Sequence, residues 1–268
     1  MKIKYLTFKL FVGIIVLFFT TISLSCEDIL KLNVAGDGNI VVDSLRWRNG
    51  FNIRELELTD DFILEIYQSE TPALYIEADS NLMAYIKTDF IRNRLILRRQ
   101  SDHFLKPSKN IIVRLFINNL SLIEIWNRGI VVCDTLRNTT LSVNSYGKSK
   151  FSCNNVEVEN FFFRAESGTI VDIKGNFIYL DYTQIGSGES NIYGNVETFR
   201  LLQEGSGKIE AFNLEANVAF VTLKHSGLIY CHVSNFLTVE INGTGRLFYR
   251  GSPEIEIVDG EEGVFRSD

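Results

Sequence analysis

Short apolar runs alternate with polar turns through the second half of the chain, and a glycine returns in each turn. Apolar residues occupy alternate positions in pairs such as Phe161 with Phe163 and Leu180 with Tyr182, as in strands with one buried face. The turn glycines are Gly129, Gly147, Gly168, Gly188, Gly207, Gly227 and Gly245, separated by 18, 21, 20, 19, 20 and 18 residues. Self-similarity at such a period predicts a solenoid of stacked coils.

Each coil has a second apolar run after the glycine and then a third, weaker apolar point. The third points are Leu136, Val156, Phe177, Val196, Leu214 and Val233. Two or three short strands per coil fit a parallel β-helix, because each strand needs only about three or four residues and each corner about one or two. The sequence therefore predicts an all-β protein built as a parallel β-helix.

The repeated glycines are expected at the corners of the coils. Glycine reaches positive φ without steric cost and so lets the chain turn sharply. On this interpretation, a valine at Gly207 would strain one corner by roughly 1 to 3 kcal/mol.

The first part of the body, residues 36–100, alternates apolar and polar positions without the glycine repeat. Strands are predicted at 56–58, 62–67, 74–78 and 95–97. Residues 80–86 begin with a Ser-Asn pair that caps helices, and fit either one helical turn or a short loop. We expect irregular capping strands here, because an uncapped solenoid end exposes core and strand edges.

The first 25 residues have the features of a signal peptide, with three lysines ahead of an almost uncharged apolar stretch. Small residues precede Cys26 in a pattern that resembles the lipobox of bacterial lipoproteins, where the signal peptide is cleaved and the cysteine is acylated. We therefore expect Cys26 to be lipidated and to attach the protein to a membrane. Simple secretion and an uncleaved anchor are the alternatives, although the apolar stretch is shorter than the roughly 20 residues that span a bilayer.

The expected organisation has one continuous body. It consists of a signal peptide at 1–25, a lipidated cysteine and short tether at 26–35, a β-helix at 36–253 and a C-terminal tail or cap at 254–268. The chain has only three prolines and no linker rich in Ser, Gly or Pro, so no internal domain boundary is predicted.

The charge of the chain makes nucleic acid an unlikely partner. The formal net charge is −6, and removal of three lysines with residues 1–25 makes the mature protein more acidic still, which opposes binding to phosphate backbones. The basic run Arg92, Arg94, Arg98 and Arg99 fits the solvated face and ends of a strand. A basic groove for an acidic polysaccharide is the alternative for these arginines.

Three cysteines remain when Cys26 is assigned to lipid. They are Cys133, Cys153 and Cys231, an odd number that excludes a complete disulfide framework. Buried free thiols are favoured, while a disulfide between Cys133 and Cys153 in adjacent coils stays open. No CxxC occurs and the histidines have no ligand spacing, so no metal and no cofactor are expected.

Motifs that indicate catalysis are absent or incomplete. The Gly-Ser-Gly turns at 186–188 and 205–207 lack the third glycine of a dinucleotide-binding loop, and no GxSxG nucleophile elbow occurs. A β-helix polysaccharide lyase or hydrolase would need clustered carboxylates. The acids near the turns, Glu166, Asp172, Glu189, Glu204 and Glu210, fall at different offsets from the glycines and do not predict such a cluster.

Aromatic residues suggest binding instead. The tyrosines Tyr146, Tyr179, Tyr182, Tyr193, Tyr230 and Tyr249 could include an exposed stripe on which sugar rings stack, whereas most phenylalanines are expected in the core.

Two segments carry a resemblance to a known family. The first is Ile76-Glu77-Ala78-Asp79-Ser80-Asn81-Leu82, followed by Ile86-Lys87-Thr88 and Leu95-Ile96-Leu97; the second is the closing segment 237–253. Together with the Ser-Gly turns they resemble the head GIN domain family of auto-transporter adhesins over about residues 36–253. The resemblance implies a single-stranded right-handed β-helix, common on secreted or lipid-anchored proteins of Bacteroidota, and carries over no catalytic residues.

These observations favour a non-catalytic binding or adhesion module of the cell envelope, anchored to the outer membrane through Cys26. Its ligand is expected to be a glycan or another surface component; whether it faces outward or into the periplasm stays open. A structural protein that self-associates into homo-oligomers is the second possibility, and a polysaccharide lyase or hydrolase the third.

Overall fold

The computed structural model describes residues 32–45 and 53–267, and within them strands account for nearly all regular structure. The first strands are β1 Leu32–Ala35, β2 Ile40–Leu45, β3 Glu55–Leu58, β4 Ile63–Gln68, β5 Ala73–Asp79, β6 Ile86–Ile91, β7 Arg94–Arg99, β8 His103–Lys106, β9 Ile112–Ile117 and β10 Leu122–Ile125. The long strands are β11 Ile130–Ser145, β12 Lys150–Ser167, β13 Ile170–Gly186, β14 Glu189–Gly205, β15 Lys208–His225 and β16 Leu228–Gly243. The last are β17 Arg246–Arg250, β18 Glu254–Asp259 and β19 Val264–Arg266.

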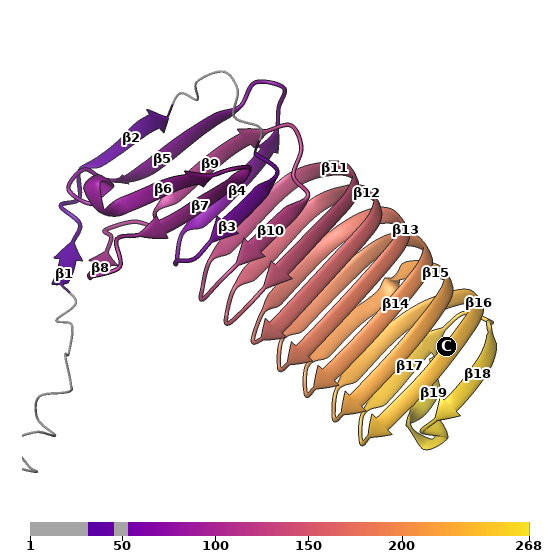
Figure 1. Cartoon of the computed structure of the whole chain (residues 1–268). Helices are drawn as coiled ribbons and strands as arrows, with labels where there is room; N and C mark the ends of the chain where they lie inside the picture. The colour runs from indigo at the N-terminus through magenta and orange to yellow at the C-terminus, as the bar shows by residue number, and fades with distance from the viewer. Residues whose placement is uncertain (1–31, 46–52, 268) are drawn as a thin grey trace, which may run out of the picture.

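Strands β11 to β16 stack in parallel, one under another, as a solenoid (Figure 1). Register is kept from coil to coil along whole columns of residues. One buried column is Phe161, Leu180, Phe199, Ala219 and Leu237. The predicted parallel β-solenoid is thus confirmed, and the apolar pairs of the sequence are its inward columns.

Each coil is one long bent strand, so the expectation of two or three separate short strands was wrong. Strands β11 to β16 each run for 16 to 18 residues. The bend lies near the third apolar point, and register shifts occur beside it, between Cys153 and Val156 and between Asn191 and Gly194. Between β11 and β12 and between β13 and β14, register pairs continue through the bend without a shift, so the strand curves there without ending.

The core lies between the two halves of each bent strand. Inward residues from both halves meet there: Phe151 from the first half of β12 contacts Phe163 from its second half, with ring centroids 5.3 Å apart. All six predicted third apolar points are buried as well. Full burial of such a side chain contributes about 1.5 to 3 kcal/mol, so every coil adds to one continuous core.

The repeated glycines do not share one position in the turn. Gly129, Gly188, Gly207, Gly227 and Gly245 directly precede a column of register partners: Ile130, Lys150, Ile170, Glu189, Lys208, Leu228 and Arg246. Ser149 and Thr169 fill that position in the two intervening coils. Gly147 lies two residues before Ser149, and Gly168 lies one residue before Thr169. This difference explains why the glycine spacing in the sequence was uneven.

Positive φ occurs in a different column from the one predicted. Of the seven predicted corner glycines, Gly147 alone has positive φ. The left-handed residues, one in each successive turn, are Asn127, Gly147, Ser167, Gly186, Gly205, His225 and Gly243, with φ from 61° to 141°. Most are glycine, and asparagine also tolerates this conformation well.

Close packing explains the glycines that lie two residues after these left-handed positions. A Cβ on Gly188 would lie 2.3 Å from the carbonyl oxygen of Thr169, and one on Gly207 would lie 2.2 Å from Nε2 of Gln184. Gln184 is buried in the preceding coil, where its Nε2 donates to the carbonyl oxygen of Gly188 at 2.8 Å. These glycines therefore make room for the neighbouring coil, and the cost expected for a valine at Gly207 arises from a clash, since φ there is not positive.

The two kinds of glycine can be told apart by alanine substitution. Gly188→Ala is expected to lower the free energy of unfolding by about 1 to 3 kcal/mol, because its Cβ meets fixed backbone. Gly168→Ala is the matched control: its Cβ would lie 3.7 Å from its nearest neighbours, so we expect a change within about 1 kcal/mol. Urea unfolding of both variants measures the difference, and equal losses would contradict this account.

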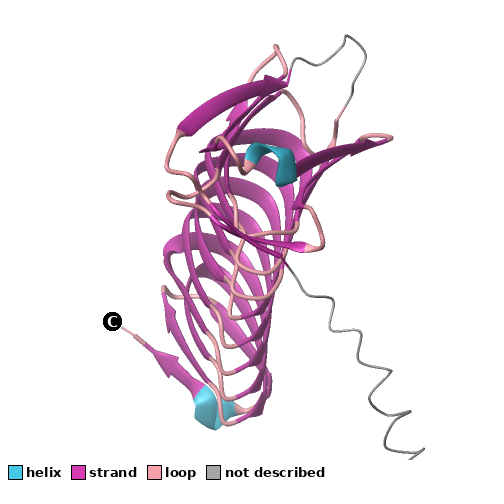
Figure 2. Cartoon of the chain, turned by 90° about the vertical axis from the view of Figure 1, so that its left-hand side faces the viewer, coloured by secondary structure: helices cyan, strands magenta, loops and turns pink. Residues whose placement is uncertain are grey.

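Antiparallel strands close the N-terminal end of the solenoid, at the top of Figure 2. β5 pairs with β2 and β9, and β6 pairs with β7, all antiparallel. The predicted strands 56–58, 62–67, 74–78 and 95–97 correspond to β3, β4, β5 and β7. Residues 80–86, for which the sequence left a helical turn and a short loop open, contain a single 3-10 turn at Met83–Tyr85. No helix in the described part of the chain is long and apolar enough to cross a membrane.

Asp79 fastens this cap together. Its buried carboxylate accepts hydrogen bonds from the backbone N–H of Gly38 at 2.8 Å and from the N–H and hydroxyl of Ser108 at 2.9 and 2.6 Å. Gly36 passes so close that a Cβ there would lie 2.3 Å from Cγ of Asp79. The hydrogen bonds from Ser108 lower the pKa of Asp79 because they favour the charged form. The Glu-Ala-Asp segment therefore has a structural role.

From the hydrogen bonds to the Asp79 carboxylate we predict that the protein loses stability in acid. The pKa of Asp79 is lower in the folded state than in the unfolded state, where it is about 4. Asp79 therefore contributes to the free energy of unfolding above about pH 4. This contribution is lost as the pH falls through the lower pKa of the folded state. Asp79→Asn should unfold more easily at neutral pH and lose stability less steeply between about pH 5 and pH 2. Thermal unfolding across this range measures the slope. Asp43→Asn, at an exposed site in β2, is the control and should keep the wild-type slope.

The C-terminal segment continues the stacking beyond the predicted boundary at residue 253. β18 pairs in parallel with β16, and β19 with β17, so residues 254–266 add a further partial coil. Exposed apolar side chains lie on it, namely Ile257, Val258 and Phe265. Similarly, β1 lies within the predicted tether and pairs with β8.

Candidate functional site

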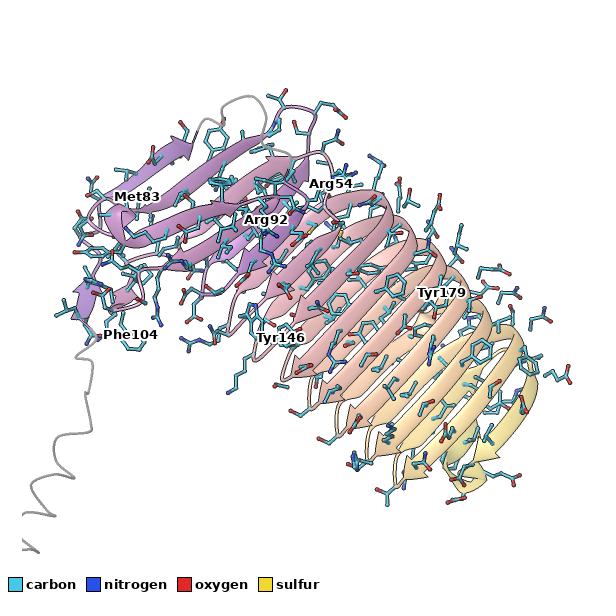
Figure 3. The ribbon with its side chains drawn as sticks, viewed as in Figure 1. Arg54, Met83, Arg92, Phe104, Tyr146 and Tyr179 are labelled. Atoms are coloured by element: carbon cyan, nitrogen blue, oxygen red, sulfur yellow. The ribbon has the colours of Figure 1, made fainter. Side chains whose placement is uncertain are left out.

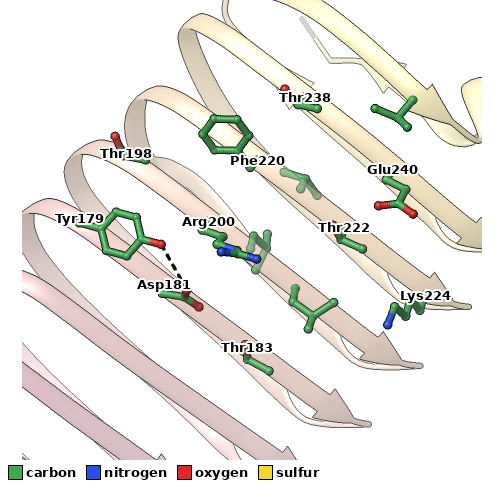
Figure 4. Close-up of a pocket in the computed structure, with 14 residues that line it drawn as sticks. Tyr179, Asp181, Thr183, Thr198, Arg200, Phe220, Thr222, Lys224, Thr238 and Glu240 are labelled. Carbon is green, nitrogen blue, oxygen red and sulfur yellow. Dashed lines mark hydrogen bonds between the residues drawn. The ribbon is translucent and has the colours of Figure 1, made fainter.

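A broad depression of ≈ 890 Å³ lies on the outer face of the second halves of β13 to β16. We call it the face groove, and Figure 4 shows the side chains that line it. Its outward-pointing residues are Tyr179, Asp181, Thr183, Thr198, Arg200, Leu202, Phe220, Thr222, Lys224, Thr238 and Glu240, joined at the C-terminal end by Val258 of β18. They alternate along each strand with the buried residues of the core, so the strands that build the core also fix the groove.

Strand register sets which groove residues are neighbours. One column across the coils is Asp181, Arg200, Phe220 and Thr238, and the next is Thr183, Leu202, Thr222 and Glu240. Adjacent members of a column lie about 4.8 Å apart, and adjacent columns roughly 7 Å apart. The groove is therefore a rigid array that combines aromatic, hydroxyl and charged groups.

Two aromatic rings stand at the groove. Tyr179 contacts Phe162 of the preceding coil with centroids 5.9 Å apart, and its hydroxyl donates to Oδ2 of Asp181 at 3.3 Å. Phe220 is 44% exposed and has no ring contact with any described residue. An exposed ring on a fixed strand is a platform for an apolar ligand face.

Charges of both signs line the groove. Arg200 is exposed and makes no side-chain hydrogen bond or ion pair within the described residues. Glu240 accepts a hydrogen bond from Asn242 at 2.8 Å, and Lys224 lies 3.9 Å from Glu204. With Asp181 held by Tyr179, Arg200 is the charged group left free to bind a ligand.

Four threonines add hydroxyl groups that are half-buried: Thr183, Thr198, Thr222 and Thr238. Each hydroxyl both donates and accepts hydrogen bonds. Together with the rings and Arg200, they suit a ligand with alternating hydroxyl groups and apolar ring faces. Sequence reasoning missed Arg200, Phe220 and these threonines, because only the exact register of the coils places them side by side.

The predicted tyrosine stripe is divided among several environments. Tyr182 is fully buried, where its hydroxyl lies 2.5 Å from that of Ser190 and desolvation raises its pKa. Tyr146 stacks on Trp126 with centroids 4.2 Å apart, well away from Tyr179 (Figure 3). Tyr230 stacks on Phe248 and meets Phe212 edge to face, on the opposite half of the coil. Tyr179 is the tyrosine that lines the face groove.

The acids considered for catalysis are dispersed. Glu166 pairs with Arg164 at 2.6 Å and Glu210 with Lys208 at 2.5 Å. Asp172 and Glu189 lie on the first halves of β13 and β14, whereas the face groove lies on the second halves. Among the described residues, no group of three or more His, Cys, Asp or Glu could hold a metal ion.

Three of the four arginines of the basic run in the N-terminal cap are paired with acids, and Arg92 is exposed in the turn between β6 and β7. Arg94 contacts Glu55, Glu57 and Glu124 at 2.9, 2.9 and 2.7 Å. Arg98 pairs with Asp89 and Arg99 with Asp60. These arginines serve the packing of the cap, and the structure offers them little freedom to form a basic groove.

Cys133, Cys153 and Cys231 are buried free thiols. Cys133 and Cys153 are register partners in adjacent coils, as predicted. Burial raises the pKa of Cys133 and raises the pKa of Cys231 to about 12, so these two thiols stay neutral. All three cysteines serve as core residues. Cys26 and the predicted signal peptide lie outside the described residues.

A protein-family model matches most of the chain. The model of the family described as "Putative auto-transporter adhesin, head GIN domain" matches residues 52–253. No protein with a curated description matches the chain.

Several solved structures share the fold. A structure described as "putative adhesin from Parabacteroides distasonis ATCC 8503" has a TM-score of 0.79 and 16% identity, covering 88% of this chain and 97% of its own. A "Putative lipid binding protein" from the same organism has a TM-score of 0.71 and 22% identity, covering 88% and 100%. A "putative adhesin from Parabacteroides merdae ATCC 43184" has a TM-score of 0.69 and 20% identity, covering 87% and 96%. At these identities the likeness shows the fold alone.

Proposed function

We propose, since this chain belongs to the head GIN domain family of auto-transporter adhesins, that it is a non-catalytic binding module of the cell envelope whose face groove binds a glycan. The family description indicates an adhesin-like protein at the envelope or cell surface. That the ligand is a glycan is inferred from the chemistry of the side chains that line the face groove.

The observation that carries the proposal is the combination of exposed ring, hydroxyl groups and free guanidinium on one rigid sheet face. Phe220 offers an apolar platform, which suits the apolar face of a sugar ring. The threonines and Arg200 supply hydrogen-bonding groups around it. Because the backbone of these strands is already held by the core, little conformational entropy is lost when a ligand binds.

Substitution of the rings tests the proposal. Tyr179→Ala and Phe220→Ala together should weaken binding to a responsive oligosaccharide about tenfold or more, because stacking area is lost. The double variant should remain folded, since both side chains point outward. A glycan array identifies the oligosaccharide, and calorimetry measures the change.

Ile178→Ala is the matched control, because Ile178 is 58% exposed but lies near the bend, outside the face groove. It should bind like the wild type. An array without any bound glycan, or equal losses in control and double variant, would contradict the proposal.

We also propose that the module is anchored to the outer membrane by a lipid on Cys26. The support is the sequence of residues 1–26 alone, with its basic start, apolar stretch and lipobox-like end. A short tether would then hold the solenoid close to the lipid surface, with the face groove presented by rigid coils.

Self-association is a second candidate function, favoured by the C-terminal end. Within the described residues no strand pairs with the outer edges of β18 and β19, and Ile257, Val258 and Phe265 are exposed there. Such an edge can pair with another strand. However, three acids lie on β18: Glu254, Glu256 and Asp259. If two copies paired through this strand, their acids would repel one another.

Sedimentation velocity tests self-association. We expect a monomer at low ionic strength, because the acids of β18 repel one another, and at most weak association in high salt, where the repulsion is screened. Val258→Lys should abolish any association that uses this edge. Tight oligomers at low salt that Val258→Lys leaves intact would exclude the edge as the contact.

A further inference from the structure

We propose that Arg200 is the anchor for a sugar carboxylate, so that the face groove selects glycans containing uronic or other carboxylate sugars. This inference rests on the proposed function and adds the ligand class. It starts from one contrast: Arg94, Arg98 and Arg99 are held by acids, whereas Arg200 is exposed, points into the face groove and has no partner among the described residues.

The position of Arg200 favours a planar anion. A guanidinium presents paired N–H donors that match the two oxygens of a carboxylate. The register partners of Arg200 are Asp181 on one side and Phe220 on the other. A sugar that stacks on Phe220 would therefore place a ring substituent within reach of Arg200, since the two strands are only about 4.8 Å apart.

The acids at the groove limit how much negative charge a ligand can carry. Asp181 and Glu240 line the same depression as Arg200 and Lys224, so the groove holds two acids against two cations. A densely sulfated chain would meet repulsion from both carboxylates. A single carboxylate on the Phe220 side of Arg200 meets less repulsion than a chain of sulfates, because Arg200 then lies between it and Asp181. The groove is thus suited to a carboxylate sugar and poorly suited to a polysulfated one.

The test compares a carboxylate ligand with its ester on the same backbone, and with a sulfated chain on a different one. The probes are an oligogalacturonate methyl-esterified on every ring but one (below, the oligogalacturonate), its fully esterified form, which lacks the charge, and a dextran sulfate oligosaccharide of similar length. We expect the oligogalacturonate to bind at least about tenfold more tightly than the ester, because a charge-assisted bidentate hydrogen bond is lost in the ester. Dextran sulfate should bind more weakly than the oligogalacturonate. Calorimetry with the purified protein measures all three.

Variants of Arg200 separate a specific anchor from general charge. Arg200→Gln should reduce oligogalacturonate affinity about tenfold and leave the affinity for the ester unchanged, while Arg200→Lys should restore only part of the loss because an ammonium lacks the paired donors. Arg246→Gln is the matched control: Arg246 is also exposed but lies on the opposite half of its coil. It removes the same charge and should bind like the wild type.

The possible failures are distinct. Equal affinity for the oligogalacturonate and its ester, or equal effects of Arg200→Gln and Arg246→Gln, would overturn the carboxylate anchor while leaving glycan binding intact. Tighter binding of dextran sulfate would overturn it in favour of general charge attraction. If the glycan array is empty and none of the three probes binds, the proposed function fails and this inference fails with it.

Discussion

The parallel ladder between coils is the constraint on which the rest of this structure depends. Each residue of a coil lies about 4.8 Å above its partner in the next, so a turn that fits once must fit in every coil. A left-handed residue recurs in each turn from Asn127 to Gly243. Two residues later, glycine recurs because the preceding coil fills the space that a Cβ would need, as at Gly188 and Gly207.

The same ladder organises both sides of the sheet. Inward columns build the core from residues such as Leu180 and Phe199, and outward columns build the face groove from residues such as Asp181 and Arg200. Because alternate side chains point to opposite faces, the outward residues can vary without disturbing the core. This separation explains how one fold can present different binding chemistry on a constant frame.

The two ends of the solenoid show how the stacking is stopped. At the N-terminal end, antiparallel strands cover the core, and Asp79 ties the incoming chain to the loop at Ser108. At the C-terminal end, β18 and β19 leave strand edges uncovered, and acids on β18 oppose further strand addition. One end is closed by packing, and the other is protected by charge.

The sequence by itself determined the stacked β-architecture, the inward apolar columns and the strands β3, β4, β5 and β7, because alternation of apolar and polar residues follows directly from burial of one strand face. It could not assign each turn glycine to its position, because the coils differ in length by a residue or two. Glycine also meets two separate demands in these turns, which are positive φ and close packing against the preceding coil. The sequence also could not locate the face groove. Arg200 and Phe220 are 20 residues apart in the chain, and only the register of β14 on β15 makes them neighbours. Pairing between coils is a long-range property, and it decided which outward residues could act together.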